Sequence, residues 1–167
     1  MWAMLFQNKH GHVRPWIIKF FARLYFPFLG AGIRLKKVAD DYRYVRVEMP
    51  LTWYNRNYVG TQFGGSIYAM CDPIYMLMLM QNLGREYIVW DKAANIDFIK
   101  PGRRRLIAEF RWTQDEIEFI KEKTKGGDKY VFDKEVLIFD SEGTLIAKVI
   151  KTLYVRLKPA DSPSAPH

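Results

Sequence analysis

The stretch that decides the fold runs from Asn57 to Gly84 and reads NYVGTQFGGSIYAMCDPIYMLMLMQNLG. Its second part is an apolar run that contains a single acid, Asp72. The run is too long for a typical strand and is rich in good helix formers, so it predicts a helix. Because the run is apolar on every face, we expect this helix to be buried all round. A buried helix of this kind needs a sheet around it.

The rest of the chain supplies mainly strands. Alternating apolar and polar residues, ended by Pro and Gly, are typical of half-buried strands. We predict strands at residues 34–49, 87–99, 105–112, 130–139 and 144–157. Thr113-Gln-Asp-Glu116 is a capping box, which predicts a short helix over 114–124 between two of these strands. The pattern predicts an α+β fold, an antiparallel sheet curled around the long central helix.

The 167 residues are enough for one domain with a substantial core. We place this domain at 34–157, after an N-terminal helical extension at 1–33. The tail at 158–167 is rich in Pro and Ser, and we expect it to be disordered.

The N-terminal extension contains a segment rich in aromatic residues. Pro15 can begin a helix and Pro27 should end or bend it, which predicts a helix over about 15–26. Two interpretations compete for this helix. It packs on the domain or on a partner subunit, which we favour, or it makes a peripheral membrane contact through residues 15–28.

Composition limits the classes of function. The net charge is +8, which either keeps the protein soluble or attracts a phosphate-bearing ligand such as coenzyme A, and no nucleic-acid motif accompanies it. The single cysteine, Cys71, excludes an intrachain disulfide and fits a reducing, cytoplasmic compartment. The three histidines lie near the termini and no Cys/His cluster has metal spacing, so we expect no metal site.

Chemistry is expected around the start of the central helix. Gly64 and Gly65 let a ligand approach the backbone, where unpaired amides favour a developing negative charge. Helical spacing places Gly65, Tyr68 and Asp72 along one stripe. A carboxylate in an apolar helix is costly unless it is used or partnered. The alternative is structural, because Asp72-Pro73 is also what a helix cap followed by Pro looks like.

Two motifs carry a family resemblance. Phe63-Gly64-Gly65 followed by Met70-Cys71-Asp72, and Asn95-Ile-Asp-Phe-Ile-Lys100-Pro-Gly102 downstream, resemble the hotdog-fold acyl-CoA thioesterases of the phenylacetyl-CoA-pathway (PaaI) type. The resemblance covers roughly residues 34 to 157 and is closest to an uncharacterised bacterial branch of that superfamily, known only as a domain of unknown function. It implies the hotdog fold, in which domains pair edge to edge as dimers, or dimers of dimers, with two sites at the interface.

The resemblance also implies roles for individual residues. Asp72 would be the general base or nucleophile, the Gly64 N–H would be the oxyanion donor, and Asn57 would position water or substrate. Gly65, Phe63 and Tyr68 would contact the substrate. The family usually has His where this chain has Phe63, and phenylalanine cannot donate a hydrogen bond or carry a proton. The alternatives are purely structural: close packing at the glycines, and an ordinary turn position for Asn57.

The basic residues Lys100, Arg103 and Arg104 flank Pro101-Gly102, and in the resembling enzymes this region lies near the CoA phosphates. A solvated basic turn is the alternative interpretation.

We therefore expect an acyl thioester hydrolase that acts on acyl-CoA or an acyl-carrier thioester, forms a homodimer, and needs no cofactor beyond the CoA of its substrate. A non-catalytic acyl-CoA or lipid-binding hotdog module is the alternative, favoured by Phe63. A third interpretation is a membrane-peripheral structural protein.

Overall fold

A computed structural model describes residues 7–8 and 10–159. Its helices and strands, in chain order, are α2 (Pro15–Leu24), α3 (Phe26–Ala31), β1 (Arg34–Val38), β2 (Tyr44–Met49), α4 (Gly64–Ala69), α5 (Ile74–Leu83), β3 (Tyr87–Phe98), β4 (Leu106–Arg111), α6 (Gln114–Thr124), β5 (Lys129–Asp140) and β6 (Leu145–Leu157).

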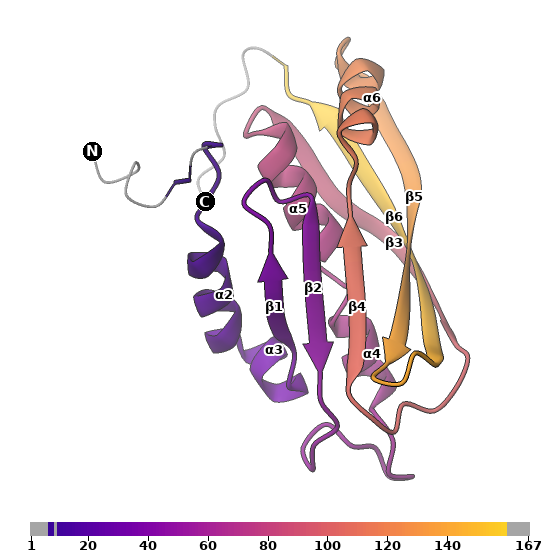
Figure 1. The fold of residues 1–167 in the computed structure, drawn as a ribbon. Helices are drawn as coiled ribbons and strands as arrows, with labels where there is room; N and C mark the ends of the chain where they lie inside the picture. The colour runs from indigo at the N-terminus through magenta and orange to yellow at the C-terminus, as the bar shows by residue number, and fades with distance from the viewer. Residues whose placement is uncertain (1–6, 9, 160–167) are drawn as a thin grey trace.

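One six-stranded sheet organises the described chain, in the order β1-β2-β4-β5-β6-β3, with every neighbouring pair antiparallel. Figure 1 shows α4 and α5 lying against one face of this sheet. The buried core joins α5 to the inward residues of β2, β4 and β6. The predicted α+β layout, a sheet around a central helical segment, is therefore confirmed.

The central helix is buried on most of its surface, but not all round as its composition predicted. Ile74, Met78 and Leu79 are fully buried, whereas Leu77 and Met80 keep more than a third of their surface exposed. An apolar sequence on every face can therefore still leave part of a helix for contact with something outside the core.

The central segment is also two helices rather than one. Residues 70–73 form a turn between α4 and α5, and the N–H groups of Cys71 and Ile74 bond three residues back instead of four. Pro73 has no N–H and its ring crowds the carbonyl four residues earlier, so it interrupts the helical ladder. The predicted C-terminal boundary is confirmed, because Gly84 ends α5 with a positive φ of 94°.

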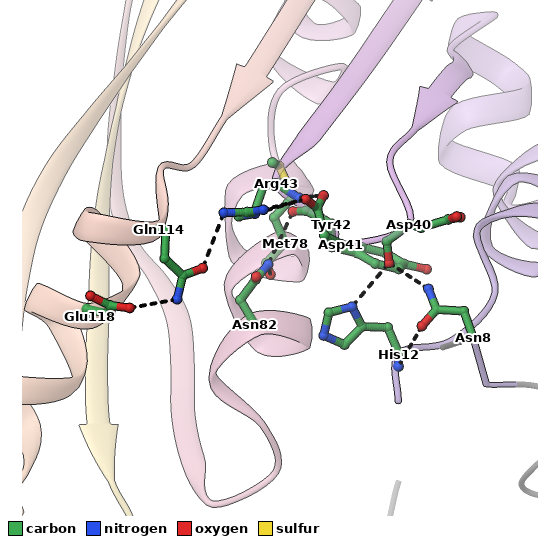
Figure 2. A network of polar contacts seen from close by, with 10 residues as sticks. All are labelled: Asn8, His12, Asp40, Asp41, Tyr42, Arg43, Met78, Asn82, Gln114 and Glu118. Carbon is green, nitrogen blue, oxygen red and sulfur yellow. Dashed lines mark hydrogen bonds and ion pairs between the residues drawn. The ribbon is translucent and has the colours of Figure 1, made fainter. Parts of the chain in front are cut away.

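The segment predicted as one strand over 34–49 is a hairpin of β1 and β2. The turn at 39–43 reverses the chain, and Tyr42 adopts a φ of 53° there. Figure 2 shows what holds this turn: the Asn82 side chain donates to the Tyr42 carbonyl, and Asn8 donates to the Asp40 carbonyl. These partners come from α5 and from the N-terminal part of the chain, which a local alternation pattern cannot reveal.

The remaining predicted strands and the inserted helix are confirmed to within a few residues at their ends. The capping box at α6 forms reciprocally, with the Thr113 hydroxyl accepting from the Glu116 N–H and the Glu116 carboxylate accepting from the Thr113 N–H. Of the tail predicted as disordered, residues 160–167 lie outside the described residues. The Lys158 N–H donates to the Glu86 carbonyl.

The N-terminal extension forms two short helices beside the edge strand β1 (Figure 1). The predicted helix over 15–26 ends at Leu24, because Tyr25 is extended and Pro27 lies in the first turn of a second helix, α3. The extension packs on the domain through Ile17, Phe28 and Ala31.

Candidate functional site

Asp72 lies in the turn between α4 and α5, where its carboxylate is held from two sides. Its Oδ1 accepts hydrogen bonds from the Tyr68 hydroxyl at 2.7 Å and from the Lys151 ammonium at 2.9 Å. The side chain keeps 50% of its surface exposed. The N-cap of α5 is Pro73, and no side chain of the described residues caps this helix. The alternative interpretation of Asp72 as a helix cap is therefore wrong.

Lys151 reaches Asp72 from the middle of β6. Successive side chains alternate across a strand, and the inward residues on either side of Lys151 are apolar. The lysine is fully buried, and its Nζ also lies 3.1 Å from Oδ2 of Asp91 and 5.1 Å from the centre of the Tyr68 ring. One buried cation thus binds two carboxylates and the face of an aromatic ring.

Asp91 supplies the second carboxylate from β3, the strand that pairs with β6. Its side chain is 17% exposed. Its Oδ1 is buried and has no hydrogen-bond partner among the described residues. A buried oxygen without a partner is costly, so Asp91 depends on Lys151 for its stabilisation.

The charges in this group, which we call the Lys151 cluster (Tyr68, Asp72, Asp91 and Lys151), act on one another. Burial acts to raise the pKa of Asp72, but hydrogen bonds from Lys151 and Tyr68 outweigh it, so this pKa is lowered and the carboxylate is ionised at neutral pH. Burial raises the pKa of Asp91. Burial alone would lower the pKa of Lys151, but its bonds to Asp72, Tyr68 and Asp91 raise it.

The sequence of β6 carries a signal for the buried position of Lys151. In the stretch from 145 to 157, Ala147, Val149, Leu153 and Val155 share one parity and are buried, and Lys151 has the same parity. A lysine on the apolar face of a strand predicts a buried partner, since an unpaired charge there is very costly. The partner itself could not be identified in this way, because Asp72 is 79 positions away.

A second feature, which we call the Gly64 pocket, lies at the start of α4 and has a volume of about 320 Å³. It brings together three of the sequence-predicted residues, Asn57, Gly64 and Lys100. Its lining is Asn57, Thr61, Gln62, Gly64, Ile67 and residues 98–102. Gly64 is the first residue of α4, where an amide has no partner within the helix.

Two aromatic rings lie against the glycines of this pocket. A Cβ built on Gly64 would lie 3.1 Å from the Phe98 ring, and one on Gly65 would lie 2.5 Å from the Phe63 ring. Both rings are more than half exposed. The glycines therefore provide close approach of aromatic side chains to the helix, as the packing interpretation expected, while the open sides of the rings offer an apolar surface beside the pocket.

Asn57 is engaged within its own loop. Its amide donates to the Thr61 hydroxyl and to the Gln62 carbonyl, and its oxygen accepts from the Thr61 N–H. These bonds fix the loop that forms one wall of the pocket, in the way expected of a turn Asn.

The three basic residues predicted to contact phosphate differ in their surroundings. Lys100 lines the Gly64 pocket and is exposed, as is Arg103. Arg104 forms ion pairs with Glu142 at 2.8 Å and Asp140 at 3.8 Å in the β5–β6 turn. Within the described part of the chain, Lys100 and Arg103 form no ion pair and are the better placed for an anionic ligand.

The Gly64 pocket and the Lys151 cluster are two separate features of one protomer. Asp72 does not line the pocket. Asp72 follows Gly64 by eight positions, which corresponds to on the order of 12 Å along a helix axis. One reacting carbonyl could not contact both groups at hydrogen-bonding distance within a single protomer.

Two other kinds of site find no support. Cys71 is completely buried and burial raises the pKa of its thiol, so it is not a reactive nucleophile. In the part of the chain that the structure describes, no group of three or more potential metal ligands is found.

Comparisons with known proteins identify a matching family and several solved structures of similar fold. The sequence profile of the domain of unknown function DUF4442 matches residues 14–155. No curated protein matches the chain. Among solved structures, it is similar to PA5026 from Pseudomonas aeruginosa, a protein of unknown function described as a probable thioesterase, with a TM-score of 0.78, 17% identity, and coverage of 87% of this chain and 97% of the other.

Two further structures share the architecture. Thioesterase HI1161 from Haemophilus influenzae gives a TM-score of 0.63 at 15% identity, over 87% of this chain and 92% of that one. Protein OLEI01261 from Chlorobaculum tepidum, of unknown function, gives 0.68 at 18% identity, over 86% and 93%. These likenesses confirm the predicted hotdog fold.

Proposed function

We propose that this chain, which belongs to the DUF4442 family within the hotdog superfamily, hydrolyses an acyl thioester to a free acid and a thiol. The observation that carries the proposal is Asp72, a half-exposed carboxylate whose Oδ1 is fixed by a buried lysine and a tyrosine. No hydrogen bond to its Oδ2 is found among the described residues, so this oxygen is available to a water molecule or a carbonyl carbon. The thioesterases among its structural neighbours agree with this reaction class.

The reaction needs an ionised carboxylate and a donor for the oxyanion. As a general base, Asp72 takes a proton from water while the water oxygen attacks the thioester carbonyl. The Gly64 N–H stabilises the tetrahedral oxyanion, the C–S bond breaks, and the departing thiolate takes the proton back from Asp72. As a nucleophile, Asp72 itself attacks the carbonyl carbon, and the C–S bond breaks to release the thiolate and leave an anhydride. Water then hydrolyses the anhydride to the free acid and the Asp72 carboxylate, and the proton released goes to the thiolate. Both routes require the charge that Lys151 and Tyr68 stabilise.

A homodimer would bring the two features together. Asp72 and the Gly64 pocket are too far apart to share one carbonyl within a protomer. Among the described residues, the 12-residue strand β3 lies at the edge of the sheet and pairs only with β6, and it carries exposed Trp90 and Phe98. Long exposed edges of this kind readily pair with another strand. Pairing of two β3 edges would place the Asp72 of one protomer toward the pocket of its partner.

The substrate carrier is proposed to be CoA or an acyl-carrier phosphopantetheine. Lys100 at the pocket and the neighbouring Arg103 offer charge for a phosphate group, and Phe63 and Phe98 offer an apolar surface for the acyl or pantetheine chain. No cofactor beyond the substrate's own carrier is needed for this chemistry.

One observation favours a second candidate, a module that binds acyl-CoA without cleaving it. Phe63 takes the position where the resembling enzymes have His, and the Asn57 side chain is occupied within its loop. Two of the groups that would assist catalysis are thus absent or already bonded.

Release of free thiol from acyl-CoAs of short, long and aromatic acyl groups tests the proposal. Asp72→Asn keeps the shape of the side chain but removes its charge, and it should lower turnover by at least about 100-fold. Asp128→Asn, an exposed acid between α6 and β5, is the matched control and should retain activity. Absence of release from the folded protein across the panel, with acyl-CoA still bound, would replace hydrolysis by the binding module.

A further inference from the structure

The N-terminal helices expose an unusual amount of aromatic surface. Seven apolar side chains of α2, α3 and the residue between them are more than half exposed, and we call them the aromatic face. They are Trp16, Phe20, Phe21, Leu24, Tyr25, Phe26 and Leu29. Large apolar patches on the surface of a monomeric protein usually mark a site where something binds.

A groove deepens this surface. It has a volume of about 510 Å³ and lies between the two helices, β1 and the start of α5. Its walls are almost wholly apolar, with Phe21 and Tyr25 of the aromatic face on one side and Leu35 and Leu77 on the other. Leu77, one of the α5 residues that the core leaves partly exposed, therefore belongs to the same surface.

The charged residues of α2, α3 and β1 are all of one sign. Residues 14–38 contain six basic residues and no acid, namely Arg14, Lys19, Arg23, Arg34, Lys36 and Lys37. None of the six forms an ion pair with an acid among the described residues. Five of them are exposed and Lys19 is partly exposed. An occupant of this surface should therefore be apolar in its interior and negatively charged at its boundary.

We propose that the aromatic face docks the protein on a bilayer that contains anionic phospholipid. Trp, Tyr and Phe enter the boundary between headgroups and acyl chains, while Lys and Arg pair with lipid phosphates. In the described part of the chain no helix has the length and apolar character to cross a bilayer, so the contact is peripheral.

A second copy of the chain fits this surface less well. Two such faces related by a twofold axis would bring together twelve basic side chains with no acid from residues 14–38 to offset them. The aromatic face also lies beside β1, at the opposite edge of the sheet from β3. Membrane docking and pairing through β3 therefore use different edges, and docking does not depend on the proposed hydrolysis.

Co-sedimentation with vesicles tests the docking. Vesicles of phosphatidylglycerol and phosphatidylcholine in equal parts should carry the protein down, vesicles of phosphatidylcholine alone should carry much less, and added salt should weaken binding. Phe20→Ser should weaken binding by at least about tenfold, because it removes one exposed aromatic side chain that would enter the bilayer. Phe119→Ser is the matched control, since Phe20 and Phe119 are both 52% exposed on helices and Phe119 lies on α6.

Lys36→Glu/Lys37→Glu is a second variant that leaves the apolar contacts intact. It should weaken binding to the anionic vesicles even if Phe20→Ser proves unstable. The proposal is overturned if the wild-type protein does not sediment with anionic vesicles, or if Phe119→Ser weakens binding as much as Phe20→Ser. It is also overturned if Phe20→Ser lowers the oligomeric mass in solution without any change in vesicle binding, which would identify the face as a subunit contact.

Discussion

The ammonium group of Lys151, fully buried in β6, lies 2.9 Å from the carboxylate of Asp72, which is half exposed in the turn between α4 and α5. This pair joins the sheet to the central helical segment at the point where Pro73 interrupts the helix. It makes Asp72 an ionised group in a defined orientation, with Oδ1 bonded and no hydrogen bond to Oδ2 among the described residues. The Lys151 cluster therefore has consequences for stability as well as for chemistry.

Replacement of the buried lysine should be costly. Lys151→Met leaves Asp91 buried without its cation, and we expect it to lower the free energy of unfolding by about 3 kcal/mol. Lys148→Met is the control, because Lys148 lies on the outward face of the same strand in a partly exposed pair with Glu135, and it should cost less than about 1 kcal/mol. Urea unfolding measures both values.

A second substitution isolates the cause. If the unpaired carboxylate is responsible, Asp91→Asn in the Lys151→Met background should recover part of the lost stability, whereas it should destabilise the wild-type protein. Equal losses for Lys151→Met and Lys148→Met would mean that the cluster contributes no more than an ordinary surface pair.

The lowered pKa of Asp72 predicts a particular response to acid. Since hydrogen bonds from Lys151 and Tyr68 overcome the effect of burial and hold this pKa below that of a free Asp, about 3.9, thiol release should persist through mildly acidic pH. The stabilisation from Asp72 is present above the unfolded pKa and is lost as pH falls through the folded pKa. The pH profile of kcat/KM and the urea midpoint against pH measure the two effects.

Conservative replacement provides the check on this assignment. In wild type, the urea midpoint should fall as pH drops from the unfolded pKa of Asp72 to its folded pKa. Asp72→Asn should make this fall shallower, while Asp128→Asn should leave it unchanged. If wild type and Asp72→Asn lose stability equally at acidic pH, the loss belongs to another carboxyl group. The raised pKa of Lys151 acts in the opposite range, since its contribution is lost only as pH rises through its folded value.

The open edge of β3 predicts the oligomeric state. A chain of 19.8 kDa should give twice that mass by light scattering. Consecutive N–H groups point to opposite sides of a strand, so either Ala93 or Ala94 presents its N–H to the open edge. Proline at that one position should leave the fold intact and produce a monomer, because it removes a donor from the edge.

Ala94→Ser retains the backbone N–H and serves as the control, which should remain dimeric. A wild-type protein that is monomeric at high concentration would exclude pairing through β3. If neither proline variant changed the mass of a dimeric wild type, the dimer would use another surface.

The departure at Phe63 offers a gain-of-function experiment. Phe63 is more than half exposed, so a histidine fits its place, beside Gly65 at the start of α4. Phe63→His introduces a group that can donate a hydrogen bond and carry a proton, and we expect thiol release to rise by about tenfold. Phe63→Tyr should change the rate less, and an equal or lower rate for Phe63→His would indicate that this chain does not use a group at that position.

The sequence by itself determined most of the secondary structure, because the signals involved are local. The capping box of Thr113 and Glu116 indicated the start of α6, and Gly84 indicated the end of α5. Alternation located β3 to β6 to within a few residues but merged β1 and β2 into one strand. The two motifs at residues 63–72 and 95–102 also indicated the hotdog fold, through their resemblance to the thioesterases. Asn57, Gly64 and Lys100, which the sequence analysis named separately as site residues, line one pocket in the structure.

The tertiary structure alone decided what each of these groups contacts. The turn at 39–43 is held by Asn82 from α5, which lies 40 positions from its partner Tyr42. Asp72 is bound by Lys151, 79 positions away, and is linked through this lysine to Asp91. Local patterns predict which face a residue occupies, but not which distant residue meets it there. Pairing of buried charges depends on how the sheet curves around the helix, which is a property of the whole fold.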